Sequence, residues 1–466
     1  MPLSEWQSAS YLHRTLVGLL RSWRQSSWLM QWAEELAALF VSLVFCLAPF
    51  VSNDLVGVLL IACAGFWVLL TLSDDAKTKL TPIHLLVLLY WGIATIATAL
   101  SPVKVAAFTG WTKLTLYLLL FALSARILRS PRLRSWVITL YLHVALIVSV
   151  YGLRQWFFGA KALATWVDPE SPLSKITRVY SYLGNPNLLA GYLLPAVVLS
   201  LMAVFAWRGW VAKTLAVTMF CVNAACLVLT FSRGGWIGLL VSIFAILVLL
   251  VYWWSVQLPP FWRTWSLPIL LVTLSLLLLL ALLFVEPVRE RVFSIFAGRE
   301  DSSNNFRINV WAAVVEMIRD RPILGIGPGN TAFNKIYPLY QCPRFNALSA
   351  YSILLEVAVE TGLIGLACFM WLFLVIFNQG ILQLQRLRSQ SSREGFWLIG
   401  AIATLLGMLA HNIGDTVWYR PEVNTLWWLM VALIASYYHV SAQKQGQRRG
   451  LGDKEMGGQG EKDHAT

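Results

Sequence analysis

The sequence is poor in charge. Only 13% of its 466 residues are Asp, Glu, Lys or Arg, whereas 58% are hydrophobic. Soluble globular domains carry about 25% charged residues, so this composition excludes a soluble protein of this length. Uncharged apolar runs of about 17–20 residues, long enough to cross a bilayer as helices, recur along most of the chain. We expect an all-α polytopic membrane protein. We assign the net charge of +13 largely to loop Lys and Arg that orient the helices, and not to nucleic-acid binding.

The six cysteines form neither a disulfide framework nor a metal-binding spacing. Five of them lie in apolar runs, where cysteine usually behaves as a small buried hydrophobe, and Cys342 stands alone in a polar loop. We therefore expect no metal and no cofactor. A cleavable signal peptide is not evident, because the first apolar run begins after about 30 residues of mixed sequence, and we read that run as a retained span.

Twelve apolar runs are candidate spans, which makes about twelve transmembrane helices. They are residues 34–51, 55–72, 82–100, 106–125, 136–153, 187–206, 214–231, 236–254, 267–285, 362–380, 396–414 and 423–440. An even number of spans puts both termini on one side of the membrane. Lys and Arg cluster in the loops of that side, for example at 126–134 and 386–393, so the positive-inside rule makes it the cytoplasmic side of an inner (plasma) membrane.

The segments outside the spans divide the chain further. Residues 1–33 alternate leucines with arginines, which favours a basic amphipathic helix on the cytoplasmic face over a disordered tail. Residues 34–442 form the membrane domain, and its large extracytoplasmic loop, residues 286–361, lies between spans nine and ten. Within that loop we predict two helices, at 310–318 and 348–359. Residues 443–466 are polar and glycine-rich, which is typical of a disordered cytoplasmic tail.

Four arginines lie where the positive-inside rule predicts few cations. This topology puts Arg178, Arg233, Arg307 and Arg420 on the non-cytoplasmic side, where loops normally lose cations. Their neighbours are Gly, Asn, Pro and Trp, including Asn187 and Trp311. Guanidinium groups retained in such loops suggest an anionic ligand. We expect the four side chains to converge on one cavity.

Each arginine motif also has a structural interpretation. In Phe231–Trp236, glycines would allow a tight turn and Arg233 could bind phosphate, or it could simply anchor the helix at the lipid headgroups. In 178–187, the amide-rich entrance to the next span could line a polar cavity, while Asn185 and Pro186 would also cap and start a helix. Both can hold at once. The glycine run 325–330 lacks the Lys-Ser/Thr pair of a Walker loop, so we interpret it as a structural turn.

His411 and Asp415 are ionisable residues at the end of span eleven. Their spacing of four would place them on one face of a helix. Ionisable groups inside spans are candidates for function, and the closeness of Arg420 in the sequence favours that interpretation. The alternative is a hydrogen bond between the two that merely satisfies a buried pair.

These motifs, in this order, resemble the O-antigen ligase and polymerase superfamily of bacterial envelope membrane proteins. The resemblance rests on Ser232-Arg233-Gly234-Gly235, on Arg307 with Trp311, on Pro322–Gly327 and on Glu360–Leu366. Segments 298–307, 348–352 and 415–422 are similar to the cyanobacterial IctB branch, whose members are named as bicarbonate transporters.

The resemblance implies chemistry on a polyprenyl-diphosphate-linked glycan outside the inner membrane. Arg178, Arg233 and Arg307 would stabilise the diphosphate leaving group, and Glu356, Glu360 or His411 could act as the base. One departure matters. Where the ligases of the superfamily have a His-Asn pair, this sequence has Tyr351-Ser352, which puts ligase activity in doubt.

Three functions are then compatible with the sequence, of which the residues favour the first and the family name favours the second. The first is glycosyl transfer, with Arg233, Arg307, His411 and Asp415 as catalytic candidates and Arg178, Asn187, Trp311, Tyr351 and Arg420 as substrate-binding candidates. The second is a bicarbonate transporter or an accessory factor in inorganic carbon accumulation, as the IctB name implies. The third is a non-catalytic membrane factor that binds an anionic lipid. The expected partners are a polyprenyl-diphosphate-linked glycan or bicarbonate, together with membrane lipids and no nucleic acid.

Overall fold

The computed structural model describes residues 20–73, 80–160, 178–284, 289, 298–300, 302–415 and 417–438. All regular structure within these ranges is helical. Most of the amphipathic helix predicted within 1–33 lies outside them, and so does the tail 443–466. The described part of the first segment contains two short helices, α3 (Arg21–Ser26) and α4 (Trp28–Gln31).

A helix covers all or most of each of the twelve predicted spans. They are α5 (Ala33–Leu47), α6 (Asn53–Ser73), α7 (Pro82–Ala99), α8 (Lys104–Ile127), α9 (Pro131–Phe158), α10 (Pro186–Ala206), α11 (Trp210–Leu229), α12 (Arg233–Trp254), α13 (Pro260–Phe284), α17 (Ile353–Ser389), α18 (Glu394–Gly414) and α19 (Pro421–Ser436). In the part of the chain that the structure describes, ten helices are long and apolar enough to cross a membrane. The all-α, multi-pass membrane architecture is thereby confirmed.

Two of the twelve helices are shorter than a typical span. α5 has 15 residues and α19 has 16. All sixteen residues of α19 are buried within the protein. Its apolar character therefore serves the protein core, so its length need not match the thickness of the lipid.

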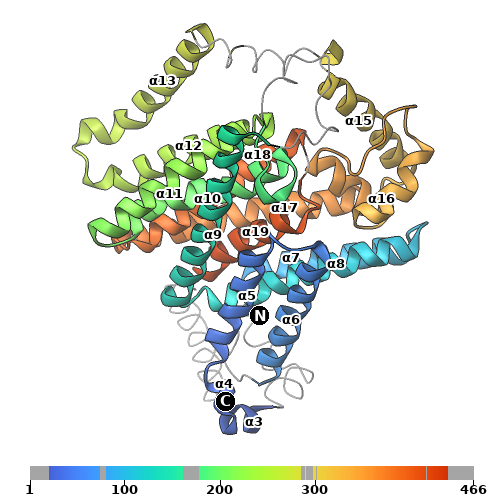
Figure 1. Ribbon diagram of the computed structural model, residues 1–466. Coiled ribbons are helices and arrows are strands. Elements are labelled where there is room, and N and C mark those ends of the chain that lie inside the picture. The colour runs from blue at the N-terminus through green and yellow to red at the C-terminus, as the bar shows by residue number, and fades with distance from the viewer. Residues whose placement is uncertain are drawn as a thin grey trace, which may run out of the picture.

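The centre of the bundle is formed by α10 and α18 (Figure 1). Within the most apolar 18 residues of each helix, 83% of the residues in α10 and 78% of those in α18 are buried. α18 packs against α10, α12, α17 and α19. Small residues let the backbones approach closely: a Cβ on Gly407 of α18 would lie 2.6 Å from the carbonyl oxygen of Gly238 in α12.

The long loop between α13 and α17 carries its own helices. α15 (Ser302–Asp320) and α16 (Asn330–Ile336) lie at one end of the bundle, beside α17 and α8 respectively (Figure 1). We call this end the loop side. A helix over 310–318 was predicted, and α15 includes it but begins eight residues earlier.

The spacing of Trp311, Val314, Val315 and Ile318 predicts that these four form the apolar face of the helix, but the buried face of α15 is a different one. Val310, Val314 and Met317 are buried, whereas Trp311, Val315 and Ile318 are only half-buried. Val314 is the single residue that the two faces share. Trp311 lies outside the core because it lines a cavity.

The second predicted helix of the loop, at 348–359, is also corrected. The helix begins at Ile353, because Tyr351 takes a left-handed conformation (φ 52°) and Ser352 is extended. α17 then runs to Ser389 with a kink at Gly362 (φ 71°). The predicted loop helix and the predicted tenth span are thus one kinked element.

The glycine run fixes the loop onto the bundle. Gly325, Gly327 and Gly329 all have positive φ, and a Cβ on any of them would lie within 2.5 Å of a neighbouring atom in α8 or α17. The amides of Ile326 and Gly327 donate to the carbonyl oxygens of Val359 and Glu360, both at 2.9 Å. These contacts agree with the structural-turn interpretation of this motif.

We predict that Gly362→Ala is strongly destabilising. The new Cβ would lie 2.0 Å from the carbonyl oxygen of Ile323, at a φ that alone costs alanine about 1–3 kcal/mol. Thermal unfolding of the detergent-purified protein measures the effect. Gly65→Ala is the control, because nothing lies within 4 Å of its Cβ position in α6. Equal melting temperatures for the two variants would contradict this prediction.

The orientation of the helices stays a prediction, and cysteine labelling tests it. In a background without native cysteines, a membrane-impermeant thiol reagent applied from outside should modify Asn346→Cys and spare Ser389→Cys. Both positions are exposed, Asn346 on the loop side and Ser389 at the far end of α17. The reverse pattern would place the loop side in the cytoplasm.

Candidate functional site

The first site arginine stands at the start of a helix. Ser232 caps α12, and its hydroxyl accepts a hydrogen bond from the amide of Gly235 at 3.2 Å. Arg233 is therefore the first residue of the helix, and its Nη1 donates to Oδ1 of Asn304 at 2.9 Å. Helix N-termini carry partial positive charge, which favours an anion at this point.

Gly234 and two further glycines surround His411. A Cβ on Gly234 would lie 2.4 Å from Cδ2 of His411, one on Gly191 would lie 3.1 Å from Cε1, and one on Gly238 would lie 3.2 Å from Cβ. Three glycines of α10 and α12 therefore leave the space that the imidazole fills. Gly235 serves a different contact, since its Cβ would meet Ala190 at 2.6 Å.

His411 is fully buried, and neither ring nitrogen has a hydrogen-bond partner among the described residues. Buried polar groups are nearly always hydrogen-bonded in native proteins. Leaving one unsatisfied costs about 1–3 kcal/mol. Because His411 lines a cavity, a polar ligand in that cavity would supply the missing partner.

Arg307 approaches the same place from α15. Its Nη1 donates to Oγ of Ser303 at 2.8 Å, and its Nη2 lies 3.5 Å from Oδ2 of Asp415. Among the described residues its buried Nε has no hydrogen-bond partner. One turn further along α15, the indole of Trp311 donates to the carbonyl oxygen of Tyr351 at 3.3 Å.

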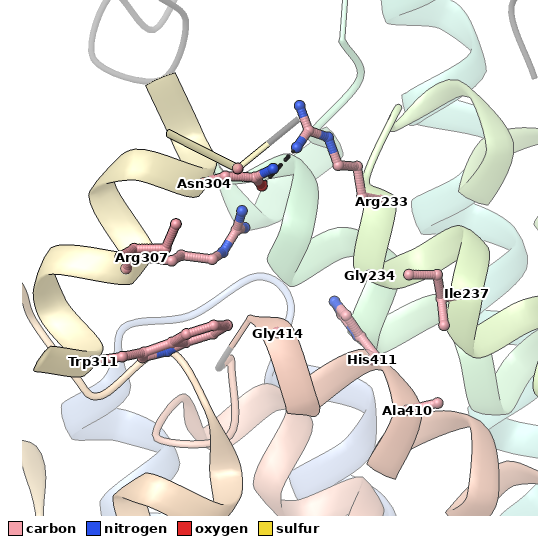
Figure 2. A pocket seen from close by; sticks show the side chains of 11 residues that line it. Arg233, Gly234, Ile237, Asn304, Arg307, Trp311, Ala410, His411 and Gly414 are labelled. Carbon is pink, nitrogen blue, oxygen red and sulfur yellow. Dashed lines mark hydrogen bonds between the residues drawn. The ribbon is translucent and has the colours of Figure 1, made fainter. Parts of the chain in front are cut away.

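These groups line one cavity of about 210 Å³. Its wall is made by Arg233, Gly234, Ile237, Gly298, Asn304, Arg307, Ile308, Trp311, Ala410, His411 and Gly414. Figure 2 shows Arg233 directed at Asn304, with Arg307 and Trp311 on one side and His411 pointing toward them from the other. We call this space the arginine cavity. No carboxylate is among its described lining residues, so its charge favours an anion.

Asp415 does not share a helix face with His411, contrary to the sequence-based prediction. α18 ends at Gly414, and Asp415 is extended (φ −150°, ψ 144°). The predicted hydrogen bond between the two is absent from the described contacts. The Oδ2 of Asp415 accepts instead from Nδ2 of Asn187 at 2.6 Å and faces Arg307.

Arg178 contacts the side chain of Asn187. Its Nη2 donates to Oδ1 of Asn187 at 3.1 Å, and its Nε donates to the carbonyl oxygen of Thr230 at 3.0 Å. Burial lowers the pKa of Arg178, Asp415 opposes that shift, and the positive charges of Arg233 and Arg307 add to it. Arg178 therefore lies within the electrostatic field of the other two arginines. Asn185 caps α10 beside it, as predicted, with Pro186 in the first turn.

Arg420 and Tyr351 belong to a neighbouring cavity of about 50 Å³. It is lined by Asn185, Asn187, Leu188, Leu348, Tyr351, Asp415, Val417, Tyr419 and Arg420. We call it the tyrosine cavity. Arg420 is partly exposed there and contacts Glu422 at 3.4 Å. Burial, then the charge of Asp415, raises the pKa of Tyr351.

The predicted convergence of four arginines is thus replaced by two adjoining cavities. Arg233 and Arg307 line the arginine cavity, and Arg420 lines the tyrosine cavity. Arg178 reaches the site through Asn187 and Asp415. Sequence reasoning missed Asn304, which binds Arg233, and Tyr419. A run of serines and asparagines at 302–305 was the available signal for the first of these.

Comparison with known proteins identifies part of the chain. Residues 214–370 match the family model described as O-antigen ligase, which covers about a third of the sequence. This segment includes Arg233, Arg307 and Trp311. No curated protein matches the chain. The apolar helices and this match together support an O-antigen ligase-like multi-pass membrane protein.

We predict that Gly234→Ala and His411→Ala are energetically coupled. The added methyl alone would collide with the imidazole, and overpacking of this kind costs about 1–3 kcal/mol. Removing the ring as well should relieve the collision, so the double variant should be more stable than the sum of the single effects by about 0.5–3 kcal/mol. Denaturation of the four proteins in detergent measures this. Strict additivity would mean that the glycine does not hold the ring.

Proposed function

We propose that the arginine cavity binds the diphosphate of a polyprenyl-diphosphate-linked glycan, and that the protein transfers or extends that glycan outside the inner membrane. The observation that carries the proposal is the meeting of Arg233, Arg307 and the unsatisfied His411 in one cavity. Two guanidinium groups can bind phosphate oxygens through charge-assisted hydrogen bonds. The match of 214–370 to O-antigen ligases supports the same substrate class.

The size of the arginine cavity suits a head group. Pockets that enclose whole small-molecule ligands measure about 300–1,000 Å³. At about 210 Å³, this one could hold a diphosphate, while the glycan and the prenyl chain extend outside it. Ile237 and Ile308 in the wall give the cavity an apolar side toward which the prenyl chain could run.

In this proposal the arginines act on the leaving group. Negative charge grows on the diphosphate as its bond to the sugar breaks, and Arg233 and Arg307 would stabilise that charge where it develops. His411 would donate a hydrogen bond from its buried ring. The N-terminus of α12, which begins at Arg233, adds its partial positive charge at the same point.

The acceptor side of the reaction differs from that of the ligases. At the position of their His-Asn pair, the backbone turns at Tyr351, and Ser352 precedes α17. We therefore favour glycan extension of the polymerase type, which by the resemblance does not depend on that pair. Bicarbonate transport, which the IctB resemblance implies, would use the same cations for a smaller anion.

Substitutions of Arg233 test the proposal. A hydrogen bond to a charged group contributes about 1.5–3 kcal/mol, so Arg233→Ala should weaken binding of undecaprenyl diphosphate by about 10- to 150-fold. Arg233→Lys keeps the charge but loses the planar fork, and it should also be clearly impaired. Binding is measured on purified protein in lipid nanodiscs. Arg319→Ala is the matched control, because Arg319 is an exposed arginine at the far end of α15.

The result also separates the competing functions. If Arg233→Lys binds undecaprenyl diphosphate as strongly as wild type, Arg233 makes no bidentate contact with the diphosphate. That result would favour the interpretation that Arg233 only anchors its helix at the lipid headgroups. Bicarbonate is added at millimolar concentration as a competitor. If the wild-type protein binds bicarbonate but does not bind undecaprenyl diphosphate, the transporter function replaces the proposed one.

A further inference from the structure

The tyrosine cavity lies beside the arginine cavity, and one ion pair separates them. Arg307 lines the first and Asp415 lines the second, and the two side chains approach to 3.5 Å. A distance of 3.5 Å is at the limit for a hydrogen bond, so the contact between these two charges is a long one. Ligands bound in the two cavities would therefore lie close to each other, on either side of Arg307 and Asp415.

A hydrogen bond from Asn187 also holds Asp415 in place. The 2.6 Å bond from Asn187 reaches Oδ2, the same oxygen that faces Arg307. Asn187 lies in the first turn of α10, whose positive end favours a carboxylate. Among the described residues, no hydrogen bond reaches Oδ1. That oxygen is left to a ligand in the tyrosine cavity.

The chemistry of the tyrosine cavity fits a neutral hydroxyl compound. Two amides (Asn185 and Asn187) and two phenols (Tyr351 and Tyr419) offer both donors and acceptors. The opposite charges of Asp415 and Arg420 in its lining cancel, so the cavity has no net positive charge that would favour a second anion such as bicarbonate or phosphate. A volume of about 50 Å³ leaves room for a hydroxyl-bearing group but not for a whole sugar, since pockets that enclose whole small-molecule ligands measure about 300–1,000 Å³.

We propose that the tyrosine cavity receives the attacking hydroxyl of the acceptor sugar, and that Asp415 is the base that takes its proton. This inference rests on the proposed function. The acceptor oxygen forms a bond to the anomeric carbon of the donor glycan. The bond from that carbon to the diphosphate breaks, and its electron pair leaves with the polyprenyl diphosphate. The hydroxyl proton moves to Asp415, and the leaving group stays with Arg233 and Arg307.

The other candidate bases are placed less well. His411 lines the arginine cavity, so it faces the donor. Glu360 accepts a hydrogen bond from the amide of Gly329 at 2.8 Å, which engages it in docking the glycine run. Glu356 is buried and is not among the described residues that line either cavity. Asp415 alone among these carboxylates borders the acceptor space.

Asp415→Asn should affect binding of the donor diphosphate and transfer to the acceptor differently. The amide fills the same volume but cannot take a proton. Because it removes a negative charge next to Arg307, binding of undecaprenyl diphosphate should be equal to wild type or tighter. Extension of undecaprenyl-diphosphate-linked oligosaccharide, isolated from the source cells and serving as both donor and acceptor, should fall by about 10²- to 10⁴-fold. Glu316→Gln, an exposed carboxylate of α15, is the control.

A second variant tests the cavity without touching Asp415. Leu348 lines the tyrosine cavity and is 51% exposed, so Leu348→Trp adds bulk at the cavity with little risk to the fold. It should slow extension at least 10-fold and leave undecaprenyl diphosphate binding unchanged. Leu339→Trp, at a 76% exposed position that lines neither cavity, should change neither property.

The outcomes separate the inference from the proposal beneath it. Retained binding with lost extension in Asp415→Asn and Leu348→Trp supports both. Normal extension in Asp415→Asn overturns the role of the base and leaves the diphosphate site intact. Normal extension in Leu348→Trp overturns the acceptor subsite. Absence of undecaprenyl diphosphate binding in wild type overturns the proposed function itself.

Discussion

The structure depends on close contact between α12 and α18 at their glycines. A Cβ on Gly407 would meet Oγ of Ser242 at 1.9 Å, and one on Gly238 would meet the carbonyl oxygen of Gly407 at 2.7 Å. Neither position can carry a side chain without separating the helices. This approach fixes the N-terminus of α12 beside the last turns of α18. Arg233 and His411, which come from these two helices, then face one cavity because their backbones can hardly move apart.

Helix ends then set the electrostatics of the site. α10 and α12 both begin here and bring partial positive charge, whereas α18 ends here and brings partial negative charge. Asp415 follows the unfavourable end of α18 but is bonded to Asn187 at the favourable end of α10. Among the described residues that meet around Arg307, one carboxylate (Asp415) stands beside three arginines, Arg178, Arg233 and Arg307. An anionic ligand would balance that excess of positive charge.

Much of this arrangement could be predicted from sequence. The twelve helices follow from apolar runs, because a bilayer and a buried protein core both demand uncharged helices. The cap at Asn185 and the turn of the glycine run follow from local backbone chemistry. The positions of Arg178, Arg233 and Arg307 at one end of the bundle follow from alternation of the spans.

What could not be predicted depends on where helices stop and on what packs against them. The spacing of His411 and Asp415 indicated one helix face, but α18 ends between them at Gly414, so Asp415 turns toward Asn187 instead. The buried face of α15 shifted because Trp311 lines a cavity that no local pattern reveals. The existence of two cavities likewise depends on tertiary contacts between loops far apart in the sequence.

The backbone at Tyr351 connects these observations with the chemistry. A left-handed Tyr351 and an extended Ser352 delay the start of α17 to Ile353, and Tyr351 lines the tyrosine cavity beside Asp415. Where O-antigen ligases have a His-Asn pair, this chain therefore has a phenol next to a carboxylate that comes from another loop. A base can be supplied from any part of the backbone that brings a group of suitable pKa within hydrogen-bond reach of the reacting hydroxyl. In the proposed reaction, the departure from the ligase motif and the placement of Asp415 are two aspects of one site.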